Sequence, residues 1–89
     1  MSKIKKSDYI KISRTLIKKL YDEGCFGKGS IYLENLKRGI PKDYIDKVEI
    51  VLDALVKQDI CGKKKKGHGW KYYLNMKRID KIREIIKEI

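Results

Sequence analysis

Four consecutive lysines, Lys63–Lys66, lead directly into Gly67-His68-Gly69 and then into Trp70 and Lys71. Ammonium groups bind phosphates, an aromatic ring can stack on a base or a sugar, and a protonated histidine adds a weak phosphate contact. So many like charges in a short segment repel one another, and a polyanion lying against them relieves that repulsion. The segment therefore predicts a nucleic-acid contact made by Lys63, Lys64, Lys65, Lys66, His68, Trp70 and Lys71.

The same residues have ordinary structural interpretations that the sequence leaves open. A run of lysines can serve only to keep a turn solvated. Trp70 shares the face of Tyr72 and Leu74 in an alternating strand, so it could cap the core instead of stacking on a base. We assign Tyr72 and Leu74 to the core and expect Tyr73, on the opposite face, to be exposed.

No spacing typical of a catalytic or metal site occurs in the sequence. Cys25, Cys61 and His68 lack the close ligand pairs of a zinc site, and no motif places a carboxylate to orient the histidine. Nucleophile-elbow and phosphate-loop signatures are also absent. The sequence predicts no enzyme activity, no metal and no cofactor. Two buried free thiols and a Cys25–Cys61 disulfide both remain open.

Composition indicates one small, strongly basic domain over residues 1–89. The chain has 23 lysines and arginines against 12 acidic residues, a net charge of +11, which suits a phosphate-binding protein. No apolar run reaches the roughly 20 residues of a membrane span, and Met1–Lys6 does not resemble a signal peptide. We expect an intracellular, cytoplasmic protein with no membrane partner. Abundant lysine and isoleucine, with little glutamine, give a thermophile-like composition.

Apolar periodicity places two helices before the middle of the chain. The first is predicted over Asp8–Glu23, capped by Ser7 or Asp8 and ended by Gly24. A glycine-rich loop follows, with a short strand at Ser30-Ile31. Leu33, Leu36 and Ile40 then indicate a short second helix that ends near Gly39.

The second half of the sequence predicts a helix, a hairpin and a last helix. Pro41 suits the first turn of a third helix, which runs to about Gln58. Its core positions are Ile45, Val48, Val51, Leu52, Leu55 and Val56. Asp59 turns the chain into a β-hairpin over Ile60–Asn75, where alternation and glycines predict two strands and a turn. Asn75 is a plausible cap for the last helix, residues 76–89.

The last helix carries isoleucines at a three-four-three spacing. They are Ile79, Ile82, Ile86 and Ile89. This spacing is typical of a heptad seam and predicts a homodimer. Packing of the same residues onto the first helix within one chain remains an alternative, because a four-turn helix also covers a small core.

The order helix, strand, helix, helix, hairpin, with Ser30–Leu36 leading through Ile40-Pro41 to Val48, Leu52 and Leu55 and then to Tyr72–Asn75, resembles the winged helix-turn-helix superfamily. It looks most like the small archaeal and archaeal-virus members. The resemblance covers residues 8–75 and implies an α+β fold. Residues 1–7, which precede this part, are expected to form a basic N-terminal arm. The helix at residues 76–89 resembles the dimerisation helix that many such proteins append.

The resemblance implies a transcription regulator that binds double-stranded DNA. Pro41–Gln58 would be the recognition helix in a major groove, and Cys61–Tyr73 the wing on the neighbouring backbone or minor groove. Carried over to this sequence, the positions expected to contact DNA at the start of the helix are Lys42, Tyr44 and Lys47.

The charge of the predicted recognition helix departs from this pattern. Residues 41–59 hold three lysines against five acidic residues, a net charge of −2, whereas residues 60–75 carry +5. Phosphates within about a Debye length of 8–10 Å repel such a helix. We therefore expect most of the affinity to come from the wing and from Met1–Lys19, which carries +6. The acidic helix also keeps open a protein-interaction or RNA-associated function.

Overall fold

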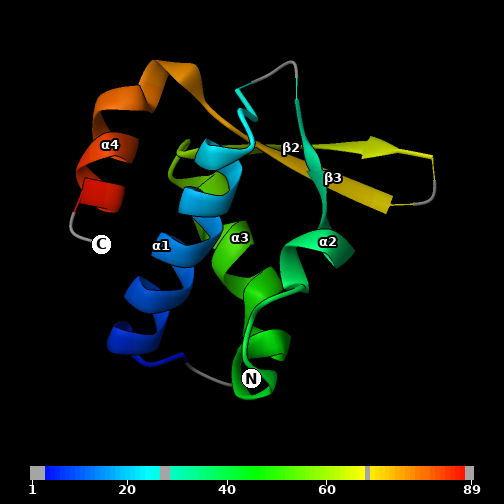
Figure 1. Ribbon diagram of the computed structural model, residues 1–89, viewed down its shortest axis with the longest axis vertical. Coiled ribbons are helices and arrows are strands. Elements are labelled where there is room, and N and C mark those ends of the chain that lie inside the picture. The colour runs from blue at the N-terminus through cyan, green and yellow to red at the C-terminus, as the bar shows by residue number, and fades with distance from the viewer. Residues whose placement is uncertain (1–3, 27–28, 68, 88–89) are drawn as a thin grey trace.

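The computed structural model describes residues 4–26, 29–67 and 69–87. In chain order its elements are α1 (Lys6–Asp22), β1 (Ile31–Tyr32), α2 (Leu33–Lys37), the 3-10 helix η1 (Lys42–Lys47), α3 (Val48–Lys57), β2 (Cys61–Lys66), β3 (Gly69–Leu74), the 3-10 turn η2 (Met76–Arg78) and α4 (Ile79–Lys87) (Figure 1). This α+β fold has a winged-helix-like topology, as the sequence predicts. The predicted roles of His68 and Ile89 lie outside the described residues. None of the described helices is long and apolar enough to cross a membrane.

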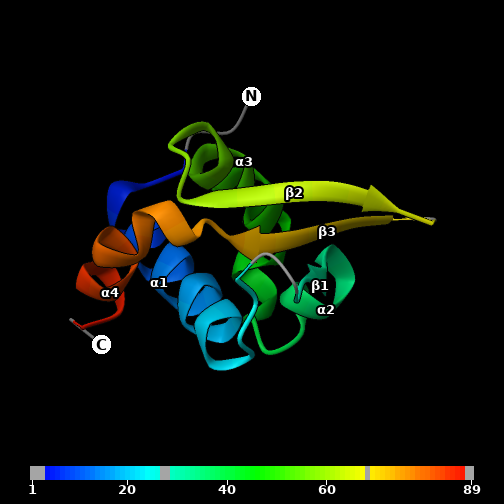
Figure 2. The same cartoon turned by 90° about the horizontal axis from the view of Figure 1, so that it is seen from above.

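The strands form one antiparallel sheet in the order β1-β3-β2. Successive side chains of a strand point to opposite faces, so the register divides the hairpin in two. The inner face holds Cys61, Tyr72 and Leu74, which are buried against the helices, and the exposed Lys63, Lys65 and Trp70. The outer face holds Gly62, Lys64, Lys66, Gly69, Lys71 and Tyr73. Both views show that the turn end of the hairpin extends beyond the helices, on the side opposite α4 (Figures 1 and 2).

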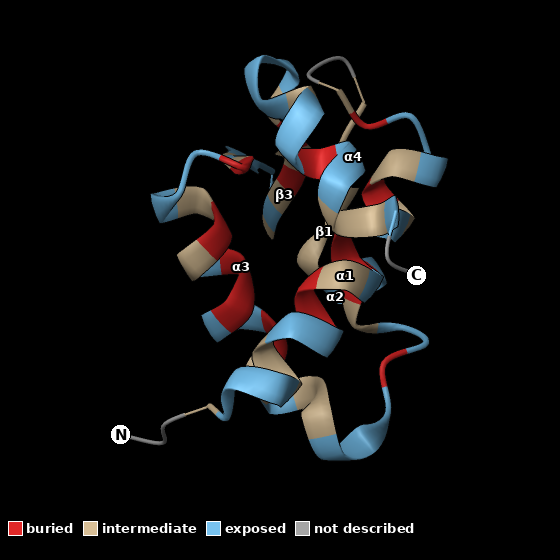
Figure 3. Cartoon of the chain, turned by 90° about the vertical axis from the view of Figure 1, so that its left-hand side faces the viewer, coloured by how far each residue is buried: buried red, intermediate tan, exposed pale blue. Residues whose placement is uncertain are grey.

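Helix α1 supplies one wall of the core through residues three or four positions apart. Ile12, Leu16, Ile17 and Leu20 are buried in the core. Figure 3 shows buried stretches, in red, on both α1 and α3. The predicted cap was wrong: α1 begins at Lys6, after Lys5, and no side chain caps it. Residues 6 and 7 therefore belong to the helix and not to an arm. Gly24 follows the helix with a φ of +68°, a conformation in which glycine avoids the strain of a side chain.

The predicted third helix is two helices with different winding. Pro41 precedes η1 as its cap, so the assignment of proline to the first α-helical turn was wrong. The 3-10 winding of η1 aligns residues three apart, and it turns Tyr44 and Ile45 toward the core beside Val48. Regular α-helix begins at Val48, and Val48, Val51, Leu52 and Leu55 are buried in α3.

The junction of the hairpin with its neighbours depends on Asp59 and Asn75. Asp59 has a φ of +62°, and its position reverses the chain after α3. The Asn75 side-chain amide donates a hydrogen bond to the Asp59 carbonyl at 2.7 Å, and its backbone N–H donates to the Ile60 carbonyl at 2.9 Å. The Asn75 side-chain oxygen also accepts from the Lys77 N–H at 3.1 Å. The predicted cap is therefore confirmed, although the element that it caps is η2.

Three of the isoleucines of α4, Ile82, Ile85 and Ile86, pack on the body of the same chain. Ile82 has no exposed surface, and Ile79, Ile85 and Ile86 are half-buried. Ile85 and Ile86 pack against the core cluster that includes residues of α1. The placement of Ile82 in a seam between two chains was wrong, because its side chain has no surface left to offer. Dimerisation through the rest of α4 stays a prediction.

Candidate nucleic-acid interface

The lysine run lies along β2, with its members alternating between the two faces of the hairpin. Lys63 and Lys65 belong to the inner face, and Lys64 and Lys66 to the outer face. Lys65 and Lys66 are exposed and lie next to the turn. This end of the hairpin extends beyond the helices (Figure 1). This arrangement spreads positive charge around the end of a projecting strand pair, within reach of a phosphate backbone.

On the inner face, Lys63 is engaged within the fold. Its ammonium lies 3.6 Å from the Asp53 carboxylate of α3 and 4.7 Å from the centre of the Trp70 ring. Trp70 itself is 41 % exposed, so it does not cap the core. Tyr72 and Leu74, two and four residues further along, are buried as predicted. Trp70 therefore remains open to a ligand on the inner side of the hairpin.

On the outer face, two tyrosines lie beside two lysines. The Lys64 ammonium lies 5.9 Å from the centre of the Tyr73 ring, and the Lys71 ammonium lies 4.7 Å from the centre of the Tyr32 ring. The expectation that Tyr73 is exposed was wrong, because its ring leans across Gly62 on β2 and is half-buried there. The outer face is thus both basic and aromatic.

The residues predicted at the start of the recognition helix do not form one exposed edge. Tyr44 is half-buried, with the ammonium of Lys11 at 5.8 Å and that of Lys47 at 5.6 Å from the centre of its ring. Lys47 also lies 3.6 Å from the Asp8 carboxylate of α1. Among the three candidates only Lys42 is exposed. Tyr44 and Lys47 join η1 to α1, an arrangement that no local sequence pattern reports.

The solvent side of η1 and α3 is acidic. Asp46, Glu49 and Asp53 are exposed there, together with Ile50 at 43 % exposure. Of these three carboxylates, only that of Asp53 has a lysine of the described residues within ion-pair distance. Three of the acidic residues counted in the sequence are therefore exposed on this surface. They would repel a phosphate backbone that approaches it.

Several cations of the basic N-terminal segment are used by the fold. The Lys19 ammonium donates hydrogen bonds to the carbonyls of Asn35 and Arg38, at 2.7 and 3.3 Å, and so satisfies the carboxyl end of α2. Lys18 pairs with Asp22 at 3.3 Å. The segment therefore offers less free charge to a ligand than its net +6 suggests.

Helix α4 carries basic residues that the sequence-based prediction did not include. Five exposed cations lie in η2 and α4, against the acidic residues Asp80 and Glu84: Lys77, Arg78, Lys81, Arg83 and Lys87. A charge count over residues 76–87 would have found them. Tyr32 was also missed, since it reaches the outer face only through the pairing of β1 with β3.

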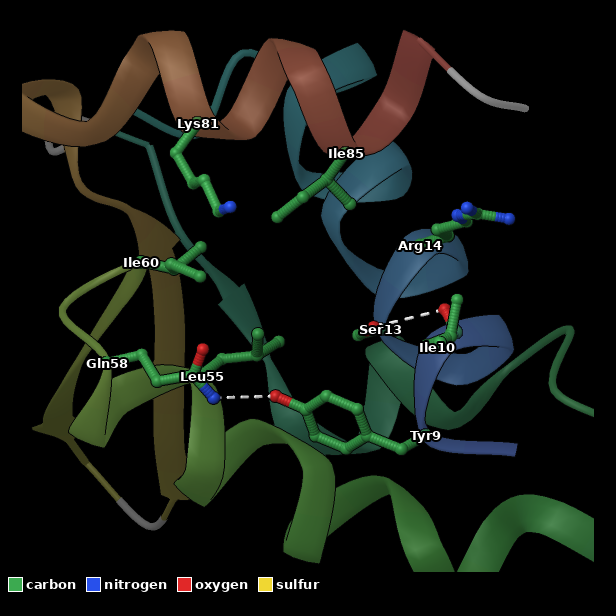
Figure 4. Close-up of a pocket in the computed structure, with 9 residues that line it drawn as sticks. All are labelled: Tyr9, Ile10, Ser13, Arg14, Leu55, Gln58, Ile60, Lys81 and Ile85. Atoms are coloured by element: carbon green, nitrogen blue, oxygen red, sulfur yellow. Dashed lines mark hydrogen bonds between the residues drawn. The ribbon is translucent and has the colours of Figure 1, made fainter. Parts of the chain in front are cut away.

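A hollow of about 230 Å³ lies between α1, the end of α3 and α4 (Figure 4). Leu55, Ile60 and Ile85 line it, and a hydrogen bond of 2.8 Å from the Gln58 amide to the Tyr9 hydroxyl crosses one side. Ile85 reaches into this space from α4, which agrees with the packing of α4 on its own chain.

Neither cysteine is placed for chemistry. Cys25 and Cys61 are free and buried, so the disulfide is not formed in this structure. Burial raises the pKa of Cys61 to about 12, and burial, followed by the charge of Glu23, raises the pKa of Cys25. Both thiols therefore stay protonated at neutral pH. Within the described ranges, no group of three histidine, cysteine or acidic side chains could hold a metal ion.

Comparison with known proteins adds no assignment. No protein-family profile, curated protein or solved structure matches this chain. Function must therefore be inferred from the fold and the surface chemistry alone.

Proposed function

We propose that this protein binds double-stranded DNA through the phosphate backbone, using the lysines of the β2–β3 hairpin. The observation that carries the proposal is the position of Lys64, Lys65 and Lys66 on a hairpin that extends beyond the helices. None of these three makes an ion pair with any described residue. Ammonium groups that make no ion pair can replace the counterions condensed on DNA phosphates, and the release of those counterions drives binding.

The helix that would read base sequence in a winged-helix protein is poorly suited to that work here. Its exposed side carries Asp46, Glu49 and Asp53. Phosphate contacts carry no base information, so binding through the hairpin has low sequence specificity. The function of a dimeric transcription regulator belongs to the same proposal, with η1 and α3 probing the groove only after the hairpin has bound.

A second candidate function is favoured by one observation. The acidic side of α3 includes Ile50, a large aliphatic side chain with 43 % of its surface exposed. An exposed apolar residue on an element that also exposes carboxylates suits a basic protein partner better than a nucleic acid. In this alternative, the hairpin contacts only an RNA backbone or no nucleic acid.

Backbone amide NMR of the full chain, titrated with a random-sequence duplex, separates the two candidates. Binding through the hairpin predicts that the largest shift changes occur at residues 63–66 and 69–71. Changes concentrated on residues 46–57, with the hairpin amides unmoved, would contradict the proposal. No change anywhere at low salt, where phosphate contacts are strongest, would remove DNA as the partner.

A further inference from the structure

The outer face of the sheet has an aromatic component that binding to duplex phosphates does not use. Tyr32 on β1 pairs with Lys71 on β3, so Tyr32 and Tyr73 are diagonal neighbours on this face. Diagonal neighbours in an antiparallel pair lie about 7–8 Å apart, within reach of one another for aromatic side chains. We call Tyr32, Lys64, Lys66, Lys71 and Tyr73 together the tyrosine–lysine face.

Glycines give the two rings their positions. A Cβ built on Gly62 would overlap the Tyr73 ring, so this ring occupies the space of a missing side chain. A Cβ built on Gly69 would lie 3.4 Å from Cδ1 of Tyr32, in van der Waals contact. Each ring therefore lies against the backbone of the neighbouring strand, at Gly62 for Tyr73 and at Gly69 for Tyr32. A ring held in this way can act as a stacking surface for a base.

The lysines around the rings are arranged for an anion. Lys64 and Lys71 are directly opposite each other in the register of β2 and β3. Like charges in this relation destabilise a strand pair unless something compensates for them. In the structure each ammonium turns away to a tyrosine ring, at 5.9 Å for Lys64 and 4.7 Å for Lys71. A phosphate placed between the two lysines would compensate both.

We infer that the tyrosine–lysine face binds unpaired nucleotides of a DNA strand. Bases stack on Tyr32 and Tyr73, while Lys64, Lys66 and Lys71 hold the phosphates. Stacking of a base on a ring is stronger than the contact of an exposed ammonium with a ring, so bases displace the lysines, which turn to the backbone. Duplex DNA cannot use this face fully, because its bases are already stacked on one another.

The choice of DNA rests on the proposed function, whereas the stacking itself rests only on the tyrosines. The protein would then recognise a duplex that carries an unpaired stretch. The hairpin lysines would hold the backbone, and the outer face would hold the open strand.

Fluorescence anisotropy with a single strand of about 15 thymidines and with a duplex of the same length tests the inference. Replacing either ring by Tyr32→Leu or Tyr73→Leu should weaken single-strand binding at least about fivefold. Duplex binding should change less than about twofold, because phosphate contacts remain. Tyr73→Phe is the matched control, since it keeps the ring and should keep the affinity. Unchanged single-strand binding in both leucine variants would overturn the inference without touching the proposed function.

Photocrosslinking of the unmutated protein makes the test independent of variant folding. A single strand containing 5-iododeoxyuridine, which joins to aromatic side chains stacked on it, should crosslink at Tyr32 or Tyr73. Crosslinks confined to Trp70 or to the helices would overturn the inference. A matching strand of uridines provides the RNA comparison: binding more than about tenfold tighter than to thymidines would overturn the choice of DNA.

Discussion

Gly62 has no side chain, and the ring of Tyr73 on the neighbouring strand fills the space that a side chain would need. Glycine inside a strand normally weakens it, because it costs backbone entropy and offers nothing to pack. Here the cross-strand tyrosine supplies the missing contact. Gly62 interrupts the strand pattern in the sequence, but its missing side chain is what allows the Tyr73 ring to lie on the outer face of the sheet.

Gly62→Ala should lower the free energy of unfolding by about 1–3 kcal/mol, because the new methyl group and the Tyr73 ring cannot share one position. Urea unfolding measures the change. Gly69→Ala is the matched control, since its methyl group would meet Tyr32 at an ordinary distance of 3.4 Å. Equal stability of the two variants would contradict a Tyr73 ring that is held in place across Gly62.

Two buried groups on the inner face make stability depend on alkaline pH. Burial raises the pKa of Cys61 from 9.0 to about 12 and that of Tyr72 from 10.0 to about 12. Both groups stay protonated in the folded chain at a pH where the unfolded chain has lost these protons. Their contribution is thus complete below about pH 9 and falls as the pH rises toward 12, by about 1.4 kcal/mol per unit for each titrating group.

Urea unfolding at a series of pH values between 8 and 11, on the unmutated protein and on Cys61→Ala, measures this dependence. The substitution removes one of the two groups, so the fall between pH 9 and pH 10, where Tyr72 contributes less than Cys61, should be shallower. An identical dependence in the two proteins would show that Cys61 ionises normally in the folded chain.

At the scale of elements, periodicity identified the helices and the hairpin, but it gave neither the start of α1 nor the 3-10 winding of η1. The alternation Trp70, Tyr72, Leu74 placed β3 and its core residues, and the lysine run placed the candidate interface. The boundary between η1 and α3 was not predictable, because Pro41 suits the start of either helix type. Tyr44 and Lys47 contact residues of α1, and Tyr32 pairs with Lys71, which is 39 positions later in the sequence. Contacts between residues so far apart in the chain depend on the tertiary structure and leave no local sequence pattern.

Helix α4 shows how one pattern supports two structures. A three-four-three spacing of isoleucines fits a seam between chains and equally fits the surface of α1 in the same chain. Burial decides for Ile82, which is fully enclosed within one chain, while Ile86 is only half-buried. The isoleucine spacing alone could not distinguish packing against a second chain from packing against α1 of the same chain.

Ile82→Glu should therefore unfold or nearly unfold the chain, with a loss of at least about 3 kcal/mol from the cavity and the unpaired buried charge. Ile86→Glu should cost about 1 kcal/mol. Circular dichroism on heating measures both changes, and light scattering reports whether the unmutated chain is a dimer. If the unmutated chain is a dimer and Ile82→Glu converts it to a well-folded monomer, Ile82 lies in the dimer interface. That result would contradict the packing of α4 on its own chain.

Across the whole molecule, charge is separated by element. The hairpin and α4 expose cations, whereas the solvent side of α3 exposes carboxylates. A net charge of +11 draws the protein toward any polyanion, and the separation of charge then decides which side meets it. The hairpin end should therefore meet the phosphates first, ahead of η1 and α3.

The salt dependence of duplex binding tests a DNA-binding hairpin most directly. The triple variant Lys64→Ala, Lys65→Ala, Lys66→Ala should stay folded, and its slope of log affinity against log salt should shrink by about 0.9 for each phosphate that the protein no longer neutralises. Lys63→Ala is the matched control, because this lysine is already paired with Asp53 at 3.6 Å and should change the slope least. The predicted slope of the triple variant is smaller in magnitude than that of Lys63→Ala by about two to three. A folded triple variant with the slope of the unmutated protein would contradict a DNA-binding hairpin.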